Sequence, residues 1–171
     1  HFNGAEMNIA SNNCIVGNTF YPLIYNCGVL NYNGGSLTNN VAVPFVNYGE
    51  MNLGKGLMVA NPLRNYNIDN AALVYGSLTI DGSNFQDDIY LGKGTGKGCV
   101  TIYEMFSNNQ LGLVCPEAED GWVAFKGGKD YKLTETDLRR IVLADDLSKE
   151  YMLALEDNTF VLRALAGQKY N

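Results

Sequence analysis

The stretch Ile15-Val16-Gly17-Asn18 recurs through the first part of the chain at nearly constant spacing. Four later copies begin 22, 21, 20 and 22 residues apart: Leu37-Thr38-Asn39-Asn40, Met58-Val59-Ala60-Asn61, Leu78-Thr79-Ile80-Asp81 and Val100-Thr101-Ile102-Tyr103. Each copy is short and rich in aliphatic or β-branched residues, which is typical of a β-strand. A fixed period of this length indicates a solenoid.

Two further columns fall between these copies. Gly28-Val29-Leu30-Asn31 recurs as Gly49-Glu50-Met51-Asn52, and more loosely as Asn70-Ala71-Ala72-Leu73, at steps of 21. The third column is Leu23, Phe45, Tyr66 and Ile89. Three strands per period of about 21 predict a parallel β-helix, in which each strand pairs with its equivalent one coil away, about 4.8 Å along the axis. The residues predicted to point inward are Ile15, Leu37, Met58, Leu78 and Val100.

Asparagine and glycine are unusually abundant and unevenly placed. The chain of 171 residues has 21 asparagines and 19 glycines, and 16 of the asparagines lie in residues 1–70. Both residues tolerate the positive φ values of tight corners. The column Asn18, Asn40, Asn61 and Asp81 predicts a ladder of side-chain hydrogen bonds from coil to coil. Low-complexity disorder is the alternative, and 18 Tyr and Phe residues count against it.

With these columns, residues 7–103 resemble the right-handed parallel β-helix superfamily, which includes pectate lyases, polygalacturonases, phage tailspikes and bacterial surface adhesins. The resemblance implies right-handed coils, in agreement with the rule for parallel crossovers. We therefore expect an all-β fold, with a right-handed parallel β-helix of about five coils over residues 1–106. A small α+β cap is expected over residues 107–171.

The predicted cap contains two hairpins and one short helix. Residues 122–125 and 131–133 form the first predicted hairpin, and residues 151–155 and 159–163 form the second. Thr134 is a predicted N-cap for a helix over residues 135–142, with Asp137 completing a capping box. No comparable cap precedes the first coil, so we expect either further N-terminal chain or end-to-end stacking of another molecule there.

The carboxylates Asp81, Asp87 and Asp88 are the candidate catalytic residues. Paired carboxylates perform glycoside hydrolysis, and clustered acids in lyase-like β-helices hold calcium. The simpler interpretation makes Asp81 the end of the asparagine ladder and places Asp87 and Asp88 on a solvated insertion. No metal site is predicted, and calcium is the one cofactor considered.

Candidate ligand-binding residues are Tyr90, Lys93 and Lys97. The glycine-rich stretch 92–98 is not a phosphate-binding loop, because Gly98 stands where Ser or Thr should follow the lysine and a strand follows instead of a helix. Its two lysines have access to an anionic ligand. Tyrosine with asparagine on a flat β-face suits sugar binding, and the alternative is that the tyrosines line the core or stack for stability. Those of the coil region are Tyr21, Tyr25, Tyr32, Tyr48, Tyr66, Tyr75 and Tyr90.

Several chemistries are excluded or disfavoured by composition. His1 is the one histidine, so no internal histidine triad is possible. A net charge of −6 disfavours nucleic acid as a partner, and no apolar run reaches the roughly 18 residues of a membrane span. The cysteines do not form a zinc motif, and buried free thiols are weighed against local disulfides for Cys14, Cys27, Cys99 and Cys115.

These features favour a noncatalytic β-helix segment of a secreted or cell-surface bacterial protein that contacts carbohydrate or a host surface ligand. The alternatives are a polysaccharide lyase or glycoside hydrolase that uses the aspartate cluster, and a self-assembling filament subunit.

Overall fold

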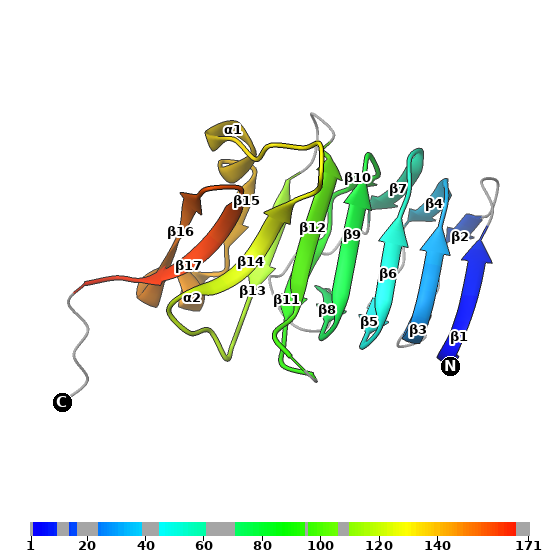
Figure 1. Cartoon of the computed structure of the whole chain (residues 1–171), viewed down its shortest axis with the longest axis horizontal. Helices are drawn as coiled ribbons and strands as arrows, with labels where there is room; N and C mark the ends of the chain where they lie inside the picture. The colour runs from blue at the N-terminus through cyan, green and yellow to red at the C-terminus, as the bar shows by residue number, and fades with distance from the viewer. Residues whose placement is uncertain are drawn as a thin grey trace.

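The computed structural model describes residues 2–9, 14–16, 24–38, 45–60, 71–94, 96–105 and 110–166. Strands account for 58% of the structure and helices for 8%, which confirms a mostly β protein. The strands are wound into a β-solenoid of about three turns, with residues 2–9 and residues 151–164 at opposite ends of the molecule (Figure 1).

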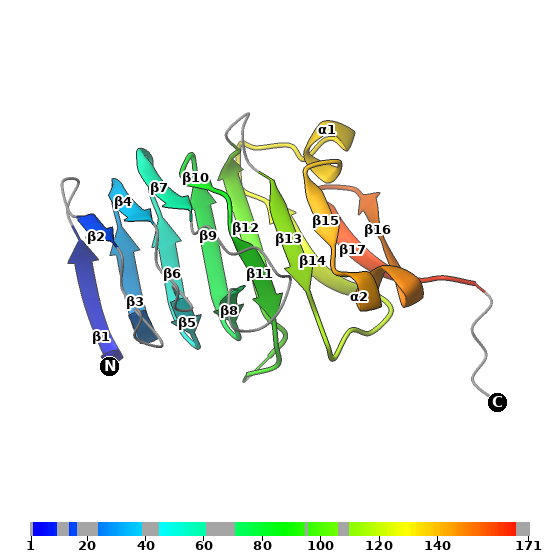
Figure 2. The same ribbon diagram turned by 180° about the vertical axis from the view of Figure 1, so that it is seen from behind.

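The strands of the solenoid fall on three faces. The strands of the first face pair in parallel and are β1 (Phe2–Ile9), β3 (Ile24–Tyr32), β6 (Glu50–Leu53), β9 (Ser77–Asp81), β12 (Cys99–Glu104) and β14 (Trp122–Gly127). The second face, seen from behind in Figure 2, contains β5 (Phe45–Asn47), β8 (Ala71–Val74), β11 (Asp88–Leu91), β13 (Leu111–Val114) and β15 (Ile141–Leu143). The third contains β2 (Cys14–Val16), β4 (Gly35–Thr38), β7 (Leu57–Ala60) and β10 (Asn84–Phe85). Strand β3 pairs with both β5 and β6, so the first two faces form one continuous sheet.

The core consists of the inward side of every face. Alternate residues of a strand point to opposite sides, and the register aligns one fully buried row across the first face: Leu30, Met51, Leu78, Val100 and Phe125. The predicted match of residues 28–31 with 49–52 is confirmed residue for residue. The third member of that column is Ser77-Leu78-Thr79, so the looser match to residues 70–73 is wrong.

The inward column predicted from the repeat therefore mixes two faces. Leu37 pairs with Val59, which in turn pairs with Phe85, and all three are fully buried on the third face. Met58 is one residue out of this register and is 40% exposed, because a slip of one residue turns a side chain to the other side of the sheet. Leu78 and Val100 belong instead to the first face.

One long coil explains the mixing. The equivalent glycines Gly28 and Gly49 are 21 residues apart, but Gly49 and Gly76 are 27 apart. The extra residues fall between β7 and β8. A constant repeat length carried across this segment therefore aligns strands that belong to different faces. In the third predicted column, the alignment of Phe45 with Ile89 is confirmed by the register of the second face, and both side chains are buried. Leu23 and Tyr66 lie outside the described residues.

Glycine forms a column at the corner between the second and first faces. A Cβ atom on Gly49 would lie 2.2 Å from the Gly28 carbonyl oxygen, and one on Gly76 would lie 2.2 Å from the Gly49 carbonyl oxygen. Only glycine allows successive coils to approach this closely.

An asparagine ladder runs beside these glycines. Asn26 and Asn47 are fully buried, and the Asn26 Nδ2 donates to Asn47 Oδ1 at 2.8 Å. Each also donates to a carbonyl of the following coil, Glu50 at 2.8 Å and Ser77 at 2.7 Å respectively. Of the predicted ladder column, Asn18, Asn40 and Asn61 lie outside the described residues. A ladder is present at a different corner, where the side-chain amides of Asn26 and Asn47 satisfy buried backbone groups.

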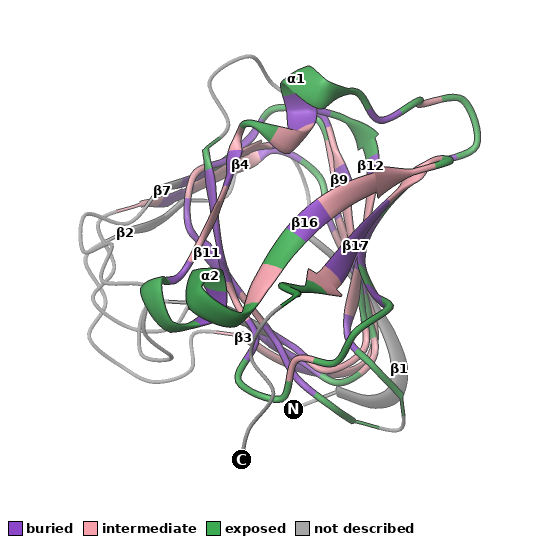
Figure 3. Cartoon of the chain, turned by 90° about the vertical axis from the view of Figure 1, so that its left-hand side faces the viewer, coloured by how far each residue is buried: buried purple, intermediate pink, exposed green. Residues whose placement is uncertain are grey.

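The C-terminal end closes the stack with antiparallel strands. Strand β14 pairs in parallel with β12 on one edge and antiparallel with β17 (Thr159–Ala164) on the other, and β17 pairs with β16 (Tyr151–Glu156). This hairpin crosses the end of the triangular coil (Figure 3). The second predicted hairpin is confirmed. The first is wrong, because β14 pairs with β12 and β17 and not with residues 131–133.

The helix predicted over residues 135–142 is shorter than expected. Helix α1 covers only Glu135–Leu138, with the predicted Thr134–Asp137 capping box present, and β15 follows at Ile141. A second short helix, α2 (Asp145–Glu150), was not predicted. The β-strand ladders of the first two faces continue across residue 106 into β13, β14 and β15 without a break.

Candidate functional site: an aromatic stripe on the solenoid

Four tyrosines from successive coils lie side by side along the corner that carries the glycine column. Tyr25 belongs to β3 and Tyr90 to β11, while Tyr48 and Tyr75 directly precede Gly49 and Gly76. Tyr48 and Tyr75 occupy equivalent positions in neighbouring coils, because Asn47 pairs with Val74. Tyr25 and Tyr90 lie two positions earlier in the register, where Tyr25 pairs with Val46 and Tyr90 pairs with Leu73. We call this set the aromatic stripe.

The stripe is a chain of ring contacts. The Tyr48 and Tyr75 rings stack with centroids 4.5 Å apart and planes 7° apart. Tyr25 joins Tyr48 at 5.8 Å and 36°, and Tyr90 joins Tyr75 at 6.1 Å and 57°. These separations are within the 4.5–7 Å range of favourable aromatic pairs. The two central rings cover each other's faces, so a ligand meets their edges.

The stripe is partly open to solvent. Tyr48 is 44% exposed, and the other three tyrosines are half-buried around the buried side chain of Val46. Burial raises the pKa of Tyr90, with a further contribution from the negative charge of Glu117. The Tyr90 phenol is therefore neutral at physiological pH.

A glycine-rich loop packs against one end of the stripe. A Cβ atom on Gly92 would lie 2.3 Å from Cε1 of the Tyr75 ring, so the loop backbone touches this ring directly. Within the loop, Gly94 N–H donates to the Gly96 carbonyl at 2.8 Å and Gly98 N–H donates to the Gly92 carbonyl at 2.9 Å.

The two lysines of this loop are held by side chains that sequence reasoning missed. Lys93 and Lys97 both pair with the Glu119 carboxylate, Lys97 at 2.7 Å. The Lys97 ammonium also lies 5.3 Å from the centroid of the Trp122 ring, within cation–π range. Hydrogen bonds from Lys93, then Lys97, lower the pKa of Glu119 to about 2. Nothing in the spacing of the sequence connects Glu119 with the loop.

The aspartate candidates do not gather in one exposed cluster. Asp87 and Asp88 are 2% and 1% exposed, and Asp88 pairs within the second face with Ala71 and Gly112, so the predicted solvated insertion is wrong. Asp81 ends β9, where its backbone pairs with that of Glu104. Within the described ranges, no group of three or more acidic, cysteine or histidine residues is arranged to hold a metal ion.

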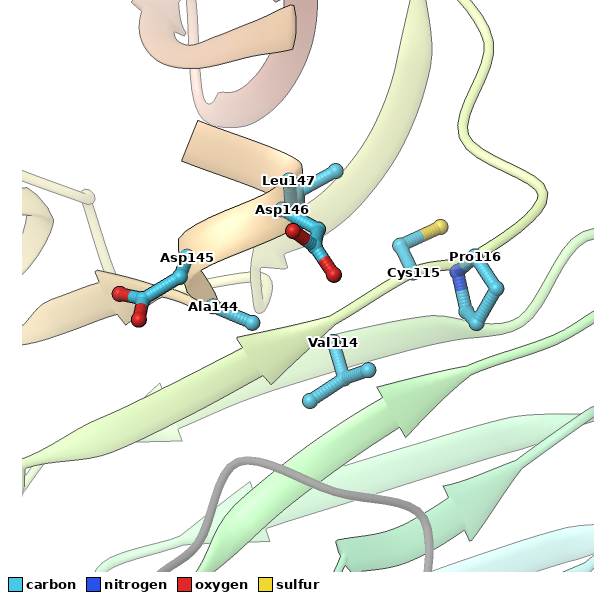
Figure 4. Close-up of a pocket in the computed structure, with 7 residues that line it drawn as sticks. All are labelled: Val114, Cys115, Pro116, Ala144, Asp145, Asp146 and Leu147. Carbon is cyan, nitrogen blue, oxygen red and sulfur yellow. The ribbon is translucent and has the colours of Figure 1, made fainter. Parts of the chain in front are cut away.

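A separate pocket of about 340 Å³ lies at the cap, between the end of β13 and the start of α2 (Figure 4). Its lining is apolar at Val114, Cys115 and Leu147 and acidic at Asp145 and Asp146. Burial raises the pKa of the Cys115 thiol to about 12, so this cysteine is not a nucleophile at neutral pH.

The remaining predictions for side chains have mixed outcomes. Tyr32 is fully buried in the core, which confirms one alternative for that tyrosine, and Tyr21 and Tyr66 lie outside the described residues. Cys27, Cys99 and Cys115 are free thiols. Among the described helices, none has the length and apolar character needed to cross a membrane.

Comparison with known proteins gives no match to a family model, a curated protein or a solved structure.

Proposed function

We propose that this chain is a noncatalytic, right-handed parallel β-helix of about five coils from a secreted or cell-surface bacterial protein, and that it binds carbohydrate along the aromatic stripe. The observation that carries the proposal is the continuous contact of four tyrosines from successive coils. A row of ring edges parallel to the axis matches an extended saccharide chain, whose repeating units would contact successive coils.

The chemistry of the stripe supports this ligand class. Tyrosine offers an apolar ring together with a hydroxyl that both donates and accepts hydrogen bonds, which suits a surface that alternates C–H and O–H groups. The rigid scaffold adds to this, because a preformed row of side chains loses little conformational freedom on binding.

Binding to a panel of immobilised glycans tests the proposal. The informative variant is Tyr48→Ala, because Tyr48 is the most exposed member of the stripe. We expect at least about tenfold weaker binding, as for removal of a central aromatic contact. Tyr103→Ala is the matched control, since Tyr103 is 47% exposed but lies on β12, outside the stripe.

Two results would overturn the proposal. Equal binding by wild-type protein and Tyr48→Ala would remove the stripe from the site. Release of new reducing ends or unsaturated sugars by the wild-type protein, with or without calcium, would favour the lyase or hydrolase alternative.

End-to-end association is a second candidate, favoured by the edges of the first coil. In the part of the chain that the structure describes, β1 pairs only with β3 and β2 pairs only with β4. An open strand edge is a template for a further strand, supplied by preceding chain or a second copy. Light scattering across a wide concentration range tests self-association, and a constant monomer mass would exclude the second copy.

A further inference from the structure

Lys93 and Lys97 converge on a single carboxylate beside the stripe. The Lys93 ammonium contacts Glu119 Oε1, and the Lys97 ammonium contacts Glu119 Oε2 at 2.7 Å. One ammonium for each oxygen is the arrangement that binds a bridging oxyanion.

The backbone of the loop sets this arrangement. Lys93 and Lys97 face each other across an antiparallel bridge, which fixes the starting points of the two side chains. The buried Trp122 secures the end of the loop, because its Nε1–H donates to the Gly98 carbonyl at 2.9 Å. Positions 92, 94, 96 and 98 are glycines, so they carry no side chains that would block the access of a ligand to the lysines.

The converging lysines adjoin the stripe. Gly92 and Gly94, on either side of Lys93, both touch Tyr75, at ring atom Cε1 and at the carbonyl oxygen respectively. A saccharide that lies on the stripe therefore meets the loop that carries both lysines.

Glu119 is a replaceable occupant of the lysine pair. Its side chain is 47% exposed, and those of Lys93 and Lys97 are 39% and 42% exposed. Ion pairs this open to water are weak and screened by salt. An anion on a ligand that gains further contacts elsewhere can therefore compete for the same two ammonium groups.

From these observations we infer that Lys93 and Lys97 form an oxyanion-binding site, which Glu119 fills in the unliganded protein and which accepts a sulfate ester or carboxylate of a bound glycan. The inference rests on the proposed function for its saccharide ligand. Glu119 acts as an internal competitor, so it weakens the binding of anionic glycans and leaves the binding of neutral glycans unchanged.

Removing the competitor is the decisive experiment. Affinities of wild-type protein and Glu119→Gln are compared for chondroitin sulfate, for unsulfated hyaluronan and for neutral dextran at low ionic strength. We expect Glu119→Gln to bind one or both anionic chains about fivefold more tightly, the scale of exposed ion pairs, with no change for dextran. The two anionic chains distinguish a sulfate ester from a carboxylate.

Matched variants isolate the lysine pair. Glu104→Gln breaks a similar exposed pair, with Lys55 at 2.8 Å, and should leave all affinities unchanged. Adding Lys93→Gln to Glu119→Gln should abolish the gain. An equal gain in the Glu104→Gln protein would reduce the effect to a change of overall charge and overturn the inference.

A probe without sugar separates failure of the inference from failure of the proposed function. Sodium sulfate is titrated against chloride at matched ionic strength while the amide signals of Gly96 and Gly98 are followed by NMR. Saturable shifts in Glu119→Gln that are weaker in wild-type protein support the anion site even if no glycan binds. Absence of shifts in both proteins overturns the inference, whereas loss of neutral-glycan binding in Tyr48→Ala would still support the stripe.

Discussion

Replacement of Gly76 by alanine should destabilise the solenoid more than any exposed substitution of similar size. The new Cβ would lie 2.2 Å from the Gly49 carbonyl oxygen and 2.8 Å from the Tyr48 carbonyl oxygen. Both contacts are with backbone atoms, so no side chain can rotate to relieve them. Real Cβ contacts do not fall below 3.0 Å, and the two coils must therefore separate locally by about 0.8 Å.

That displacement breaks a hydrogen bond of the same corner. The Ser77 N–H donates to the Gly49 carbonyl at 2.9 Å, and a shift of about 0.8 Å along the axis moves the pair beyond hydrogen-bond distance. Loss of the bond costs about 1 kcal/mol, and overpacking against backbone costs about 1–3 kcal/mol. We expect the free energy of unfolding to fall by about 2–4 kcal/mol.

Urea denaturation followed by circular dichroism measures this change. With a denaturant dependence of roughly 2 kcal/mol per molar, the midpoint should fall by about 1–2 M. Gly96→Ala is the matched control, because a Cβ there meets nothing within 4 Å, and its midpoint should stay close to that of the wild type. Equal midpoints for the two variants would refute the close-approach argument.

Asn47→Ala should lower the free energy of unfolding by about 2–4 kcal/mol, because it leaves buried partners in the coils on both sides unsatisfied; Asn52→Ala, at a half-buried rung, should cost clearly less in the same urea assay. The Glu119 carboxyl should titrate near pH 2 by NMR, and Lys93→Gln should move its pKa back toward 4.5. Because the pKa is lowered on folding, these ion pairs stabilise the protein above about pH 4.5 and are lost as the pH falls toward 2. Alkylation of Cys115 at pH 8, followed by mass spectrometry, should be about a thousandfold slower than in denatured protein, and equal rates would contradict its raised pKa.

The repeat could be predicted from the sequence because equivalent strands of successive coils place residues of the same kind at a nearly constant spacing. Residues 28–31 and 49–52 match in register as predicted, since a coil of 21 residues returns the chain to the same corner. The coil between Gly49 and Gly76 is longer, so even spacing placed Met58 and Leu78 in one column although they belong to different faces.

The candidate site was predictable only in part. Tyr90, Lys93 and Lys97 were identified by residue type, and their association with Tyr75 depends on a loop that folds back onto the stripe. The dipeptide Tyr-Gly at 48–49 and 75–76 was the one local signal for the central stack. Glu119 lies in another segment and reaches the loop only through pairing of the coils, which a search for local motifs does not detect.

The antiparallel hairpin at the C-terminal end has a consequence for the order of folding. Its strands close over a two-residue turn, with Glu156 opposite Thr159, whereas each parallel pair such as Val29 and Glu50 must first close a loop of about twenty residues. Loop closure is entropically costly and slows non-local pairing. The hairpin therefore provides the earliest edge on which β14 and then β12 can assemble, and coils should add from the C-terminal end toward β1. Amide exchange should be slowest near β14 and β17 and fastest in the first coil.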